Sequence, residues 1–246
     1  MRRLVGIGVG PGDPEMLTLR ALREISAADQ VLAPTISPDL AGRAEEVVRA
    51  VLKDVAIERV VFDMTPGLKG QSMRELAAAK AAVGVAKRAA LEGTTVFLTL
   101  GDVSLYSTFY PLQRAVRRLL PGIVVEMVPG ITAFAYLAAK TTTDLLDNSE
   151  RLYVVAILND ADLAKLTELL LDRNATIVVY KCGKRFGEVA KALQASGRLA
   201  SSMVGEQVGT AFEKIAPADQ FGYESLGYFA TVIVPALRDD LFIDRT

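Results

Sequence analysis

Four glycines alternate with apolar residues at the start of the chain. The segment reads Leu4-Val-Gly-Ile-Gly-Val-Gly-Pro-Gly-Asp-Pro14. Because glycine has no side chain, such a run predicts a short buried strand that another backbone or a ligand approaches closely. Asp13 is a suitable N-cap and Pro14 suits the first helical position, so a helix over residues 14–25 should follow directly. Apolar residues then recur at helical spacing, at Met16, Leu19, Leu22 and Ile25.

Two nucleotide-binding patterns resemble this run but fit it poorly. A Walker loop ends in Gly-Lys-Ser/Thr so that the lysine reaches phosphate, whereas Gly12 is followed by Asp13. A dinucleotide fingerprint needs an acid at the end of the next strand, and the strand expected at 30–33 ends at Pro34. Asp13 would also repel a pyrophosphate. A phosphate cradle is therefore the least favoured interpretation, after a structural turn, and we favour a site for a ligand other than a nucleotide phosphate.

The composition excludes several classes of protein. The chain of 246 residues has no histidine, which excludes a Ser-His-Asp hydrolase and an HExxH metalloenzyme. Its one cysteine, Cys182, excludes an internal disulfide and a zinc cluster, so we expect no metal and a reducing compartment. The formal net charge of −1 argues against a nucleic-acid partner, and the apolar runs are too short for a membrane span. Because the expected first strand starts at the N-terminus, we expect no signal peptide and a cytoplasmic location.

Strand-like and helix-like stretches alternate in the first half of the chain. We expect strands at 4–9, 30–33, 57–62, 95–100 and 124–128. The helices between them are expected at 14–25, 41–52, 72–91 and 109–119. This alternation is typical of an α/β domain with a mainly parallel sheet and helices on both faces.

A polar segment at 141–151 indicates a linker, so we expect an N-terminal α/β domain at 1–143 and a C-terminal α/β domain at 144–246. In the second domain, strands are expected at 152–157 and 176–180, and helices at 162–171 and 186–196. Extended segments then follow at 202–207, 210–215 and 228–234 with few residues between them. Short connections between consecutive strands imply hairpins, so the second sheet should be mixed or antiparallel.

Two further glycine-bearing segments follow expected strands. Residues 99–108 read Thr-Leu-Gly-Asp-Val-Ser-Leu-Tyr-Ser-Thr, and residues 128–134 read Val-Pro-Gly-Ile-Thr-Ala-Phe. Either segment alone is as consistent with an ordinary capped turn as with a binding site. Ligands of open α/β sheets bind beyond the carboxyl ends of the strands. Together with the first run, the two segments therefore predict that three turns converge on one crevice.

These three motifs resemble those of the tetrapyrrole methylases, which methylate precorrins and related molecules with S-adenosylmethionine. The resemblance extends essentially from end to end, including the segments that begin at Tyr180, Gly205 and Tyr228. Residues 101–112 are most similar to the precorrin-2 C(20)-methyltransferases and their cobalt-dependent counterparts. Val103 stands where many relatives have proline. The alternatives are another methylase, acting on uroporphyrinogen-III or a later precorrin, and a non-catalytic tetrapyrrole-binding protein on the same scaffold.

The resemblance implies two αβα domains with the active site in a trough between them, usually in a homodimer. It also implies that S-adenosylmethionine binds through backbone groups. Carried over by position, the cofactor contacts in the first domain are Pro11, Gly101, Asp102, Leu105, Thr132 and Ala133. In the second domain they are Tyr180 or Lys181, Gly209 or Ala211, and Ala230, Thr231 and Val232.

Direct methyl transfer from a sulfonium to a carbon of precorrin-2 needs no histidine, because the donor is already activated. Asp102, Tyr106 or water is a candidate to take the proton that leaves the methylated carbon. Precorrins carry many carboxylates, so cations near strand ends are candidate substrate contacts, although most such side chains are simply solvated surface. The expected substrate-binding residues are Gly10, Gly12, Asp13, Lys184 and Arg185, with Lys181, Lys140 and Arg114 as further cationic candidates. Cys182 is expected to be a small buried filler.

Overall fold

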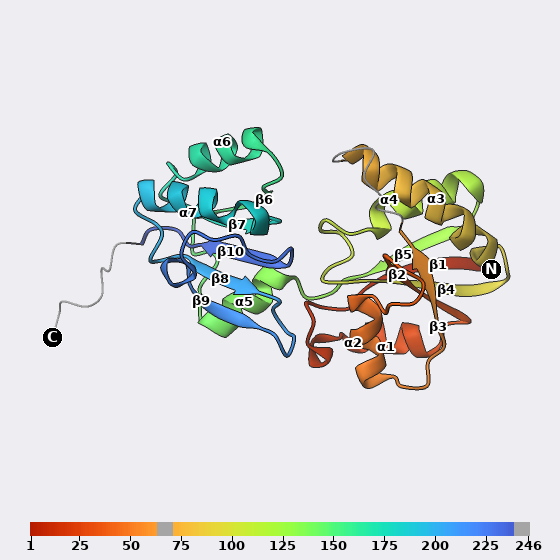
Figure 1. Cartoon of the computed structure of the whole chain (residues 1–246). Helices are drawn as coiled ribbons and strands as arrows, with labels where there is room; N and C mark the ends of the chain where they lie inside the picture. The colour runs from red at the N-terminus through yellow and green to blue at the C-terminus, as the bar shows by residue number, and fades with distance from the viewer. Residues whose placement is uncertain (63–70, 239–246) are drawn as a thin grey trace. The chain divides into compact units, whose positions relative to one another are not determined.

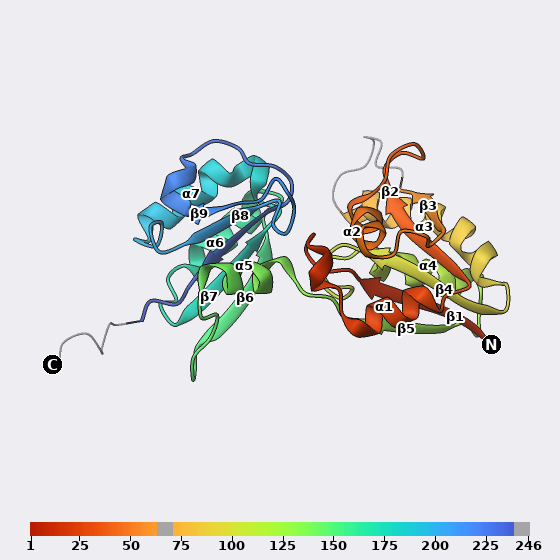
Figure 2. The same ribbon diagram turned by 90° about the horizontal axis from the view of Figure 1, so that it is seen from below.

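The computed structural model describes residues 1–62 and 71–238 of the chain. It divides into two compact units, Met1–Thr132 and Ala133–Thr246. Each unit is built on one five-stranded sheet (Figures 1 and 2). The division precedes helix α5 (Ala133–Thr141), whereas the polar composition of 141–151 predicts a boundary after that helix. The reason for the difference is that α5 packs against β10 and β8 of the second sheet.

The sheet of the first unit is parallel, as the sequence predicts. Its strand order is β3-β2-β4-β1-β5, and every neighbouring pair in it is parallel. The central strand β1 therefore has β4 on one side and β5 on the other, so the carboxyl ends of these three strands lie next to one another. The strands are β1 (Arg2–Gly8), β2 (Gln30–Thr35), β3 (Ile57–Val61), β4 (Gly93–Thr99) and β5 (Val124–Val128).

Helices cover both faces of this sheet because its strands carry apolar side chains on both sides. Helices α1 (Leu19–Ser26) and α2 (Arg43–Val51) pack on the face that includes Ile7. Helices α3 (Gln71–Ala89) and α4 (Phe109–Leu119) pack on the opposite face, around Phe97. Both faces of the strands are thus removed from water, as their two-sided apolar sequence predicts.

The continuous helix predicted over 14–25 is wrong. Asp13 and Pro14 do start a helical turn, η1 (Pro14–Met16), with the Asp13 carboxylate accepting from the Glu15 N–H at 2.9 Å. The backbone is then extended, and α1 begins only after Thr18, whose hydroxyl accepts from the Ala21 N–H at 3.1 Å. Thr18 is the N-cap of α1, so the chain forms two separate helical segments instead of one. The single apolar stripe expected along residues 16–25 is therefore also wrong, and Leu19 is 78% exposed.

The sheet of the second unit is mixed, which confirms the prediction from its short connections. Its order is β6-β7-β10-β8-β9, in which only β6 and β7 pair in parallel. Helices α6 and α7 contribute to the core on one face and α5 to that on the other. The elements are β6 (Arg151–Ala156), α6 (Asp160–Leu169), β7 (Ala175–Tyr180), α7 (Phe186–Ala195), β8 (Met203–Glu206), β9 (Lys214–Pro217) and β10 (Ala230–Val234). No helix in the part of the chain that the structure describes is long and apolar enough to cross a membrane.

One arginine of the second unit is completely buried. The Arg198 guanidinium donates to the backbone carbonyls of Ala175 at 2.6 Å and Pro235 at 2.7 Å. It also donates to the carbonyl of Asp172 at 3.3 Å. These carbonyls flank the start of β7 and the end of β10, so one side chain ties the ends of two paired strands together.

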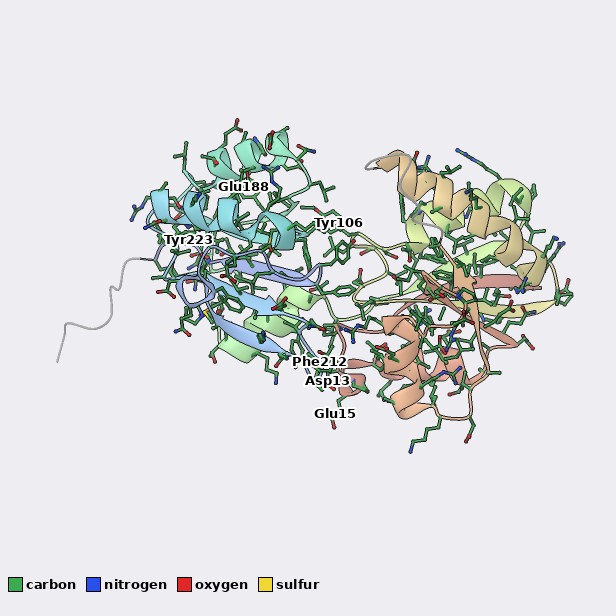
Figure 3. The ribbon with its side chains drawn as sticks, in the orientation of Figure 1. Asp13, Glu15, Tyr106, Glu188, Phe212 and Tyr223 are labelled. Atoms are coloured by element: carbon green, nitrogen blue, oxygen red, sulfur yellow. The ribbon has the colours of Figure 1, made fainter. Side chains whose placement is uncertain are left out.

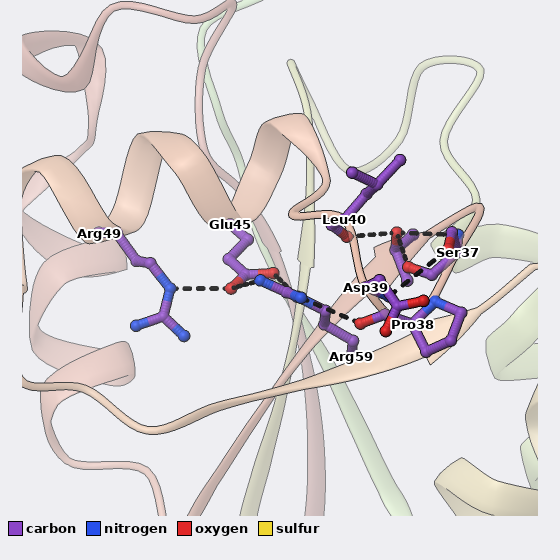
Figure 4. A network of polar contacts seen from close by, with 8 residues as sticks. Ser37, Pro38, Asp39, Leu40, Glu45, Arg49 and Arg59 are labelled. Carbon is purple, nitrogen blue, oxygen red and sulfur yellow. Dashed lines mark hydrogen bonds and ion pairs between the residues drawn. The ribbon is translucent and has the colours of Figure 1, made fainter.

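A buried carboxylate ties α2 to β3 in the first unit. Glu45 is fully buried and accepts from Arg49 Nε at 2.8 Å and from Arg59 Nε at 2.8 Å (Figure 4). Arg59 donates in addition to the carbonyl of Pro38 at 3.0 Å, in the segment that follows β2. Burial alone would raise the pKa of Glu45, but the hydrogen bonds from Arg59 and Arg49 outweigh it and hold the pKa below its usual value of 4.5.

Replacing Glu45 by glutamine should lower the free energy of unfolding by about 2 kcal/mol at neutral pH, because both arginines lose a charged acceptor. Since the folded-state pKa is depressed, this stabilisation is complete above pH 4.5 and is lost as the pH falls through the folded value. Urea unfolding of the wild type and Glu45→Gln at pH 7 and at pH 3.5 measures both effects. A difference that stays constant or grows between those pH values would contradict the assigned role of the carboxylate.

Candidate active site

The first two glycine-bearing turns pair with each other at the carboxyl edge of the first sheet. Gly10 N–H donates to the Gly101 carbonyl at 3.2 Å, and Gly101 N–H donates to the Gly10 carbonyl at 2.7 Å. Just before them, Val9 N–H donates to the Thr99 carbonyl at 2.9 Å. The segments that follow β1 and β4 are therefore joined backbone to backbone.

The third turn meets the other two at a point where a side chain would not fit. A Cβ added to Gly130 would lie 2.3 Å from the Gly101 carbonyl oxygen and 2.6 Å from the Gly8 carbonyl carbon. A Cβ added to Gly8 would lie 2.7 Å from the Gly130 nitrogen. Real Cβ atoms do not approach backbone so closely, so these positions require glycine. The predicted convergence of the three turns is confirmed, although the sequence alone did not single out Gly8 and Gly130 as site residues.

Asp102 links the second turn to the third. One oxygen of its carboxylate accepts from the Gly130 N–H at 2.9 Å, and the other accepts from the Ser104 N–H at 2.8 Å and from the Ser104 hydroxyl. Burial raises the pKa of Asp102, but these hydrogen bonds outweigh it and leave the pKa below its ordinary value. Both carboxylate oxygens are occupied by hydrogen bonds within the turns, so the geometry supports a positioning role for Asp102.

The segment after β4 presents Tyr106 to solvent. Tyr106 is 38% exposed and has a φ of +51°, which is unusual for a residue with a side chain (Figure 3). The next residue fixes the end of this segment, because the Ser107 hydroxyl accepts from the Phe109 N–H at 2.9 Å and contacts the Thr99 hydroxyl at 3.2 Å. Leu105 is half-buried, and Val103 packs in the core beside α3 and α4. Tyr106 is thus held at the same edge as the glycine turns.

The remaining first-unit candidates lie beside these turns. Pro11 and Gly12 follow the Gly10 pair directly, and the Asp13 carboxylate caps η1 (Figure 3). Gly10 has a φ of +82°, a conformation that favours glycine. Thr132 and Ala133 follow the third turn, and α5 begins at Ala133. The structure therefore places the cofactor candidates of the first unit on the three segments that meet, with Ala133 directly after them, whereas Arg114 lies on α4.

Four of the second-unit candidates lie at one edge of the second sheet. Tyr180 ends β7 and pairs with Thr231 of β10, so Lys181 lies beside the start of β10. Ala230 pairs with Glu206, the last residue of β8, which brings the segment with Gly209 to the same edge. The Tyr180 hydroxyl also accepts from the Phe134 N–H at 3.2 Å, which fixes the first turn of α5 at this edge.

Two candidates on β10 point into the core. The side chains of Thr231 and Val232 are 2% and 0% exposed, and both residues pair with β7 on one side and β8 on the other. Their backbone groups are therefore occupied by the sheet, and Ala230 at the strand end is better placed for a ligand. Ala211 is exposed on the segment that follows Gly209.

The expected cationic contacts differ in their partners. Arg185 donates to Asp160 at 2.6 Å and to Glu188 at 2.7 Å through Nε, and these hydrogen bonds, the one to Glu188 first, raise its pKa (Figure 3). Its charge is already compensated, so it is a poor partner for a substrate carboxylate. Lys184 is exposed. The Arg114 guanidinium lies 6.0 Å from the centre of the Tyr110 ring.

Cys182 is completely buried, and burial raises the pKa of its thiol to about 12. The thiol is therefore protonated and unreactive at neutral pH, which confirms that Cys182 fills the core.

Sequence reasoning did not single out Glu213, which contacts a candidate segment. Its carboxylate accepts from the Gly209 N–H at 2.6 Å, within the segment that carries two candidate cofactor contacts. The only signal in the sequence is an acidic residue four positions after a glycine, which is too common to be informative.

Residues 3–220 match the family model of the tetrapyrrole (corrin/porphyrin) methylases. This match covers most of the chain and includes all three glycine-bearing turns. The chain belongs to the tetrapyrrole methylase family. The two α/β units and the mixed second sheet agree with the architecture of that family.

Several known proteins are similar to this tetrapyrrole methylase. It is 30% identical to the cobalamin biosynthesis protein CobIJ of Mycobacterium tuberculosis over 96% of this chain, and it spans about half, 46%, of that relative's length. It is 28% identical to the precorrin-2 C(20)-methyltransferase of a Sinorhizobium species, over 96% of each chain. The uroporphyrin-III C-methyltransferase of Thermus thermophilus, solved in complex with S-adenosylhomocysteine, matches with a TM-score of 0.59 and 25% identity. That match covers 95% of this chain and 97% of the solved one.

Proposed function

We propose that this tetrapyrrole methylase transfers a methyl group from S-adenosylmethionine to carbon 20 of precorrin-2 or cobalt-precorrin-2, in cobalamin biosynthesis. The observation that carries the proposal is the convergence of Gly8, Gly101 and Gly130 beside the segment 101–112. Within the family, that segment most resembles the precorrin-2 C(20)-methyltransferases. Similarity to the Sinorhizobium enzyme over nearly the whole of both chains supports the choice of substrate.

The donor fits the first unit because three glycine turns bring backbone N–H and C=O groups together there without side chains between them. We assign donor contacts to Ala133, which begins the second unit, and in the first unit to Pro11, Gly101, Asp102, Leu105 and Thr132. In the second unit, Ala230 and the segment with Gly209 and Ala211 are the best placed of the candidates, with Tyr180 or Lys181 beside them. Thr231 and Val232 then support these contacts from inside the sheet.

The bound sulfonium supplies an activated methyl group, so the residues of the chain need only orient and shield the reactants. Correct orientation alone lowers such a barrier by about 7–11 kcal/mol. Asp102 holds the second and third turns in register through the Gly130 N–H. Because both carboxylate oxygens of Asp102 accept hydrogen bonds within the turns, we assign removal of the proton from the methylated carbon to water or Tyr106.

A methylation assay tests this proposal. The purified protein is incubated with 13C-methyl-labelled S-adenosylmethionine and, separately, precorrin-2 and cobalt-precorrin-2. We expect a mass increase of one methyl group with at least one of them, and a 13C signal that locates the methyl at carbon 20. Methylation of a different carbon or of a different precorrin alone would show that the assigned step is wrong.

The relatives also support a second candidate, methylation of uroporphyrinogen-III, because the Thermus thermophilus structure is named for that class of substrate. The same assay with uroporphyrinogen-III separates the two reactions. Binding of S-adenosylhomocysteine without turnover of any tetrapyrrole would instead favour a non-catalytic binding protein.

We further propose that the protein is a cytoplasmic homodimer. Sedimentation equilibrium measures its oligomeric state.

A further inference from the structure

We propose that Glu213 is a positioning residue that holds the segment 207–213 in the conformation that binds the methyl donor. The inference rests on the proposed function, since that segment carries the assigned donor contacts Gly209 and Ala211. It concerns a residue that makes no assigned contact with either substrate.

The Glu213 carboxylate bridges two parts of the second unit. Its Oε2 atom accepts from the Gly209 N–H at 2.6 Å, and its Oε1 atom lies 3.7 Å from Lys140 Nζ. Gly209 belongs to the segment between β8 and β9, whereas Lys140 belongs to α5. One carboxylate therefore connects the donor segment to a helix that packs on the sheet.

The segment needs such a connection because its backbone is unfavourable. Gln207 has a φ of +50° and Gly209 a φ of +75°. A side-chain-bearing residue rarely adopts the left-handed region unless its surroundings hold it there. Gln207 N–H donates to the Phe229 carbonyl at 3.2 Å, which fixes the first end of the segment beside β10. Glu213 fixes the other end.

Lys140 is itself held in place, so it is a firm anchor. Its ammonium lies 5.4 Å from the centre of the Tyr136 ring, which is only 7% exposed. Burial raises the pKa of Tyr136, and contact with the Tyr136 hydroxyl and with Glu213 raises the pKa of Lys140. Lys140 is therefore engaged on α5, which makes it a poor partner for a substrate carboxylate.

Loss of the bridge should affect donor binding more than catalysis. Val208 anchors the start of the segment in the core, but Ala211 and Phe212 near its tip are exposed (Figure 3), so packing restrains this later part little. Without Glu213 the segment samples more conformations, and the donor must select the competent one from among them. The donor affinity and its KM should then change, whereas kcat at saturating donor should stay close to the wild-type value.

Calorimetric titration with S-adenosylhomocysteine measures this effect in the full chain. Glu213→Ala should weaken binding about 10- to 100-fold, the range expected when a charge-assisted hydrogen bond is lost. Glu213→Gln keeps an acceptor for Gly209 and should lose only a few-fold, and Lys140→Met should also lose a few-fold. Glu168→Ala is the matched control, because Glu168 forms an exposed pair with Lys165 on α6 at 2.8 Å, and its affinity should equal that of the wild type.

The outcomes separate this inference from the proposed function. A wild-type protein that does not bind S-adenosylhomocysteine would refute the proposed function. If Glu213→Ala binds S-adenosylhomocysteine as tightly as the wild type, only the positioning role is refuted. If Glu213→Ala does not fold, wild-type affinity in both Glu213→Gln and Lys140→Met refutes it. Hydrogen exchange gives a readout without ligand: the Gly209 amide should exchange faster in Glu213→Ala than in the wild type, and an unchanged rate would also refute the role.

Discussion

Gly130→Val should abolish donor binding, with a loss of at least about 100-fold in affinity for S-adenosylhomocysteine. The new side chain would have to occupy space filled by the Gly101 carbonyl oxygen, 2.3 Å from the ideal Cβ position, and by the Gly8 backbone. Relief of such overlap requires the turns to separate, at about 3 kcal/mol or more, and it removes the Gly130 N–H from Asp102. Calorimetry with S-adenosylhomocysteine measures the loss of affinity, and urea unfolding measures the loss of stability in the first unit.

Gly84→Ala is the control for this prediction, because it adds a Cβ where there is room. Gly84 lies within α3, and the added atom would come no closer than 3.8 Å to Arg88 Nη1. The variant should bind the donor normally and gain about 0.5–1 kcal/mol in stability, since alanine favours a helix over glycine. Wild-type affinity in Gly130→Val would show that the convergence of the three turns has no part in donor binding.

Arg198→Met should lower the free energy of unfolding of the second unit by about 4 kcal/mol. The buried guanidinium serves the carbonyls of Asp172, Ala175 and Pro235, and methionine cannot donate to any of them. Each buried carbonyl left without a donor costs about 1–3 kcal/mol. Urea unfolding followed by circular dichroism measures the change.

Arg151→Met is the matched control for Arg198. Arg151 pairs with the Asp172 carboxylate at 2.8 Å, but its side chain is 53% exposed. An exposed pair of this kind contributes at most about 1 kcal/mol, so the control should be nearly as stable as the wild type. Arg198→Lys keeps the positive charge but lacks the several N–H donors of the guanidinium. Its stability should therefore lie between those of Arg198→Met and Arg151→Met. Equal stabilities of Arg198→Met and Arg151→Met would contradict the assigned role of Arg198.

The sequence predicts most of the fold because its signals are local. Helix Phe109–Leu119 and strand Val124–Val128 have the predicted bounds, since an apolar period and a clear turn define each of them. The prediction fails at 14–25, where the N-cap propensity of Thr18 competes with an apparently regular apolar spacing. The residues around Thr18 decide whether it starts a new helix, and the spacing of apolar residues alone does not show which outcome occurs.

The candidate site is predictable where it depends on strand ends and unpredictable where it depends on distant partners. Three glycine turns after three strands of a parallel sheet had to lie at one edge, so their convergence follows from the order of the strands. The pairing of Arg185 with Asp160 depends on how the starts of α6 and α7 pack. The bridge from Glu213 to Lys140 likewise joins residues whose proximity only the folded second unit creates.

The close approach of main chain at Gly8 and Gly130 has a consequence for attempts to redirect the enzyme. A library that randomises these two positions would yield mostly inactive proteins, since a Cβ at either one would overlap main-chain atoms. Diversity introduced at Tyr106, which is 38% exposed, leaves that junction intact. Efforts to engineer acceptance of a different macrocycle should therefore begin at this neighbour.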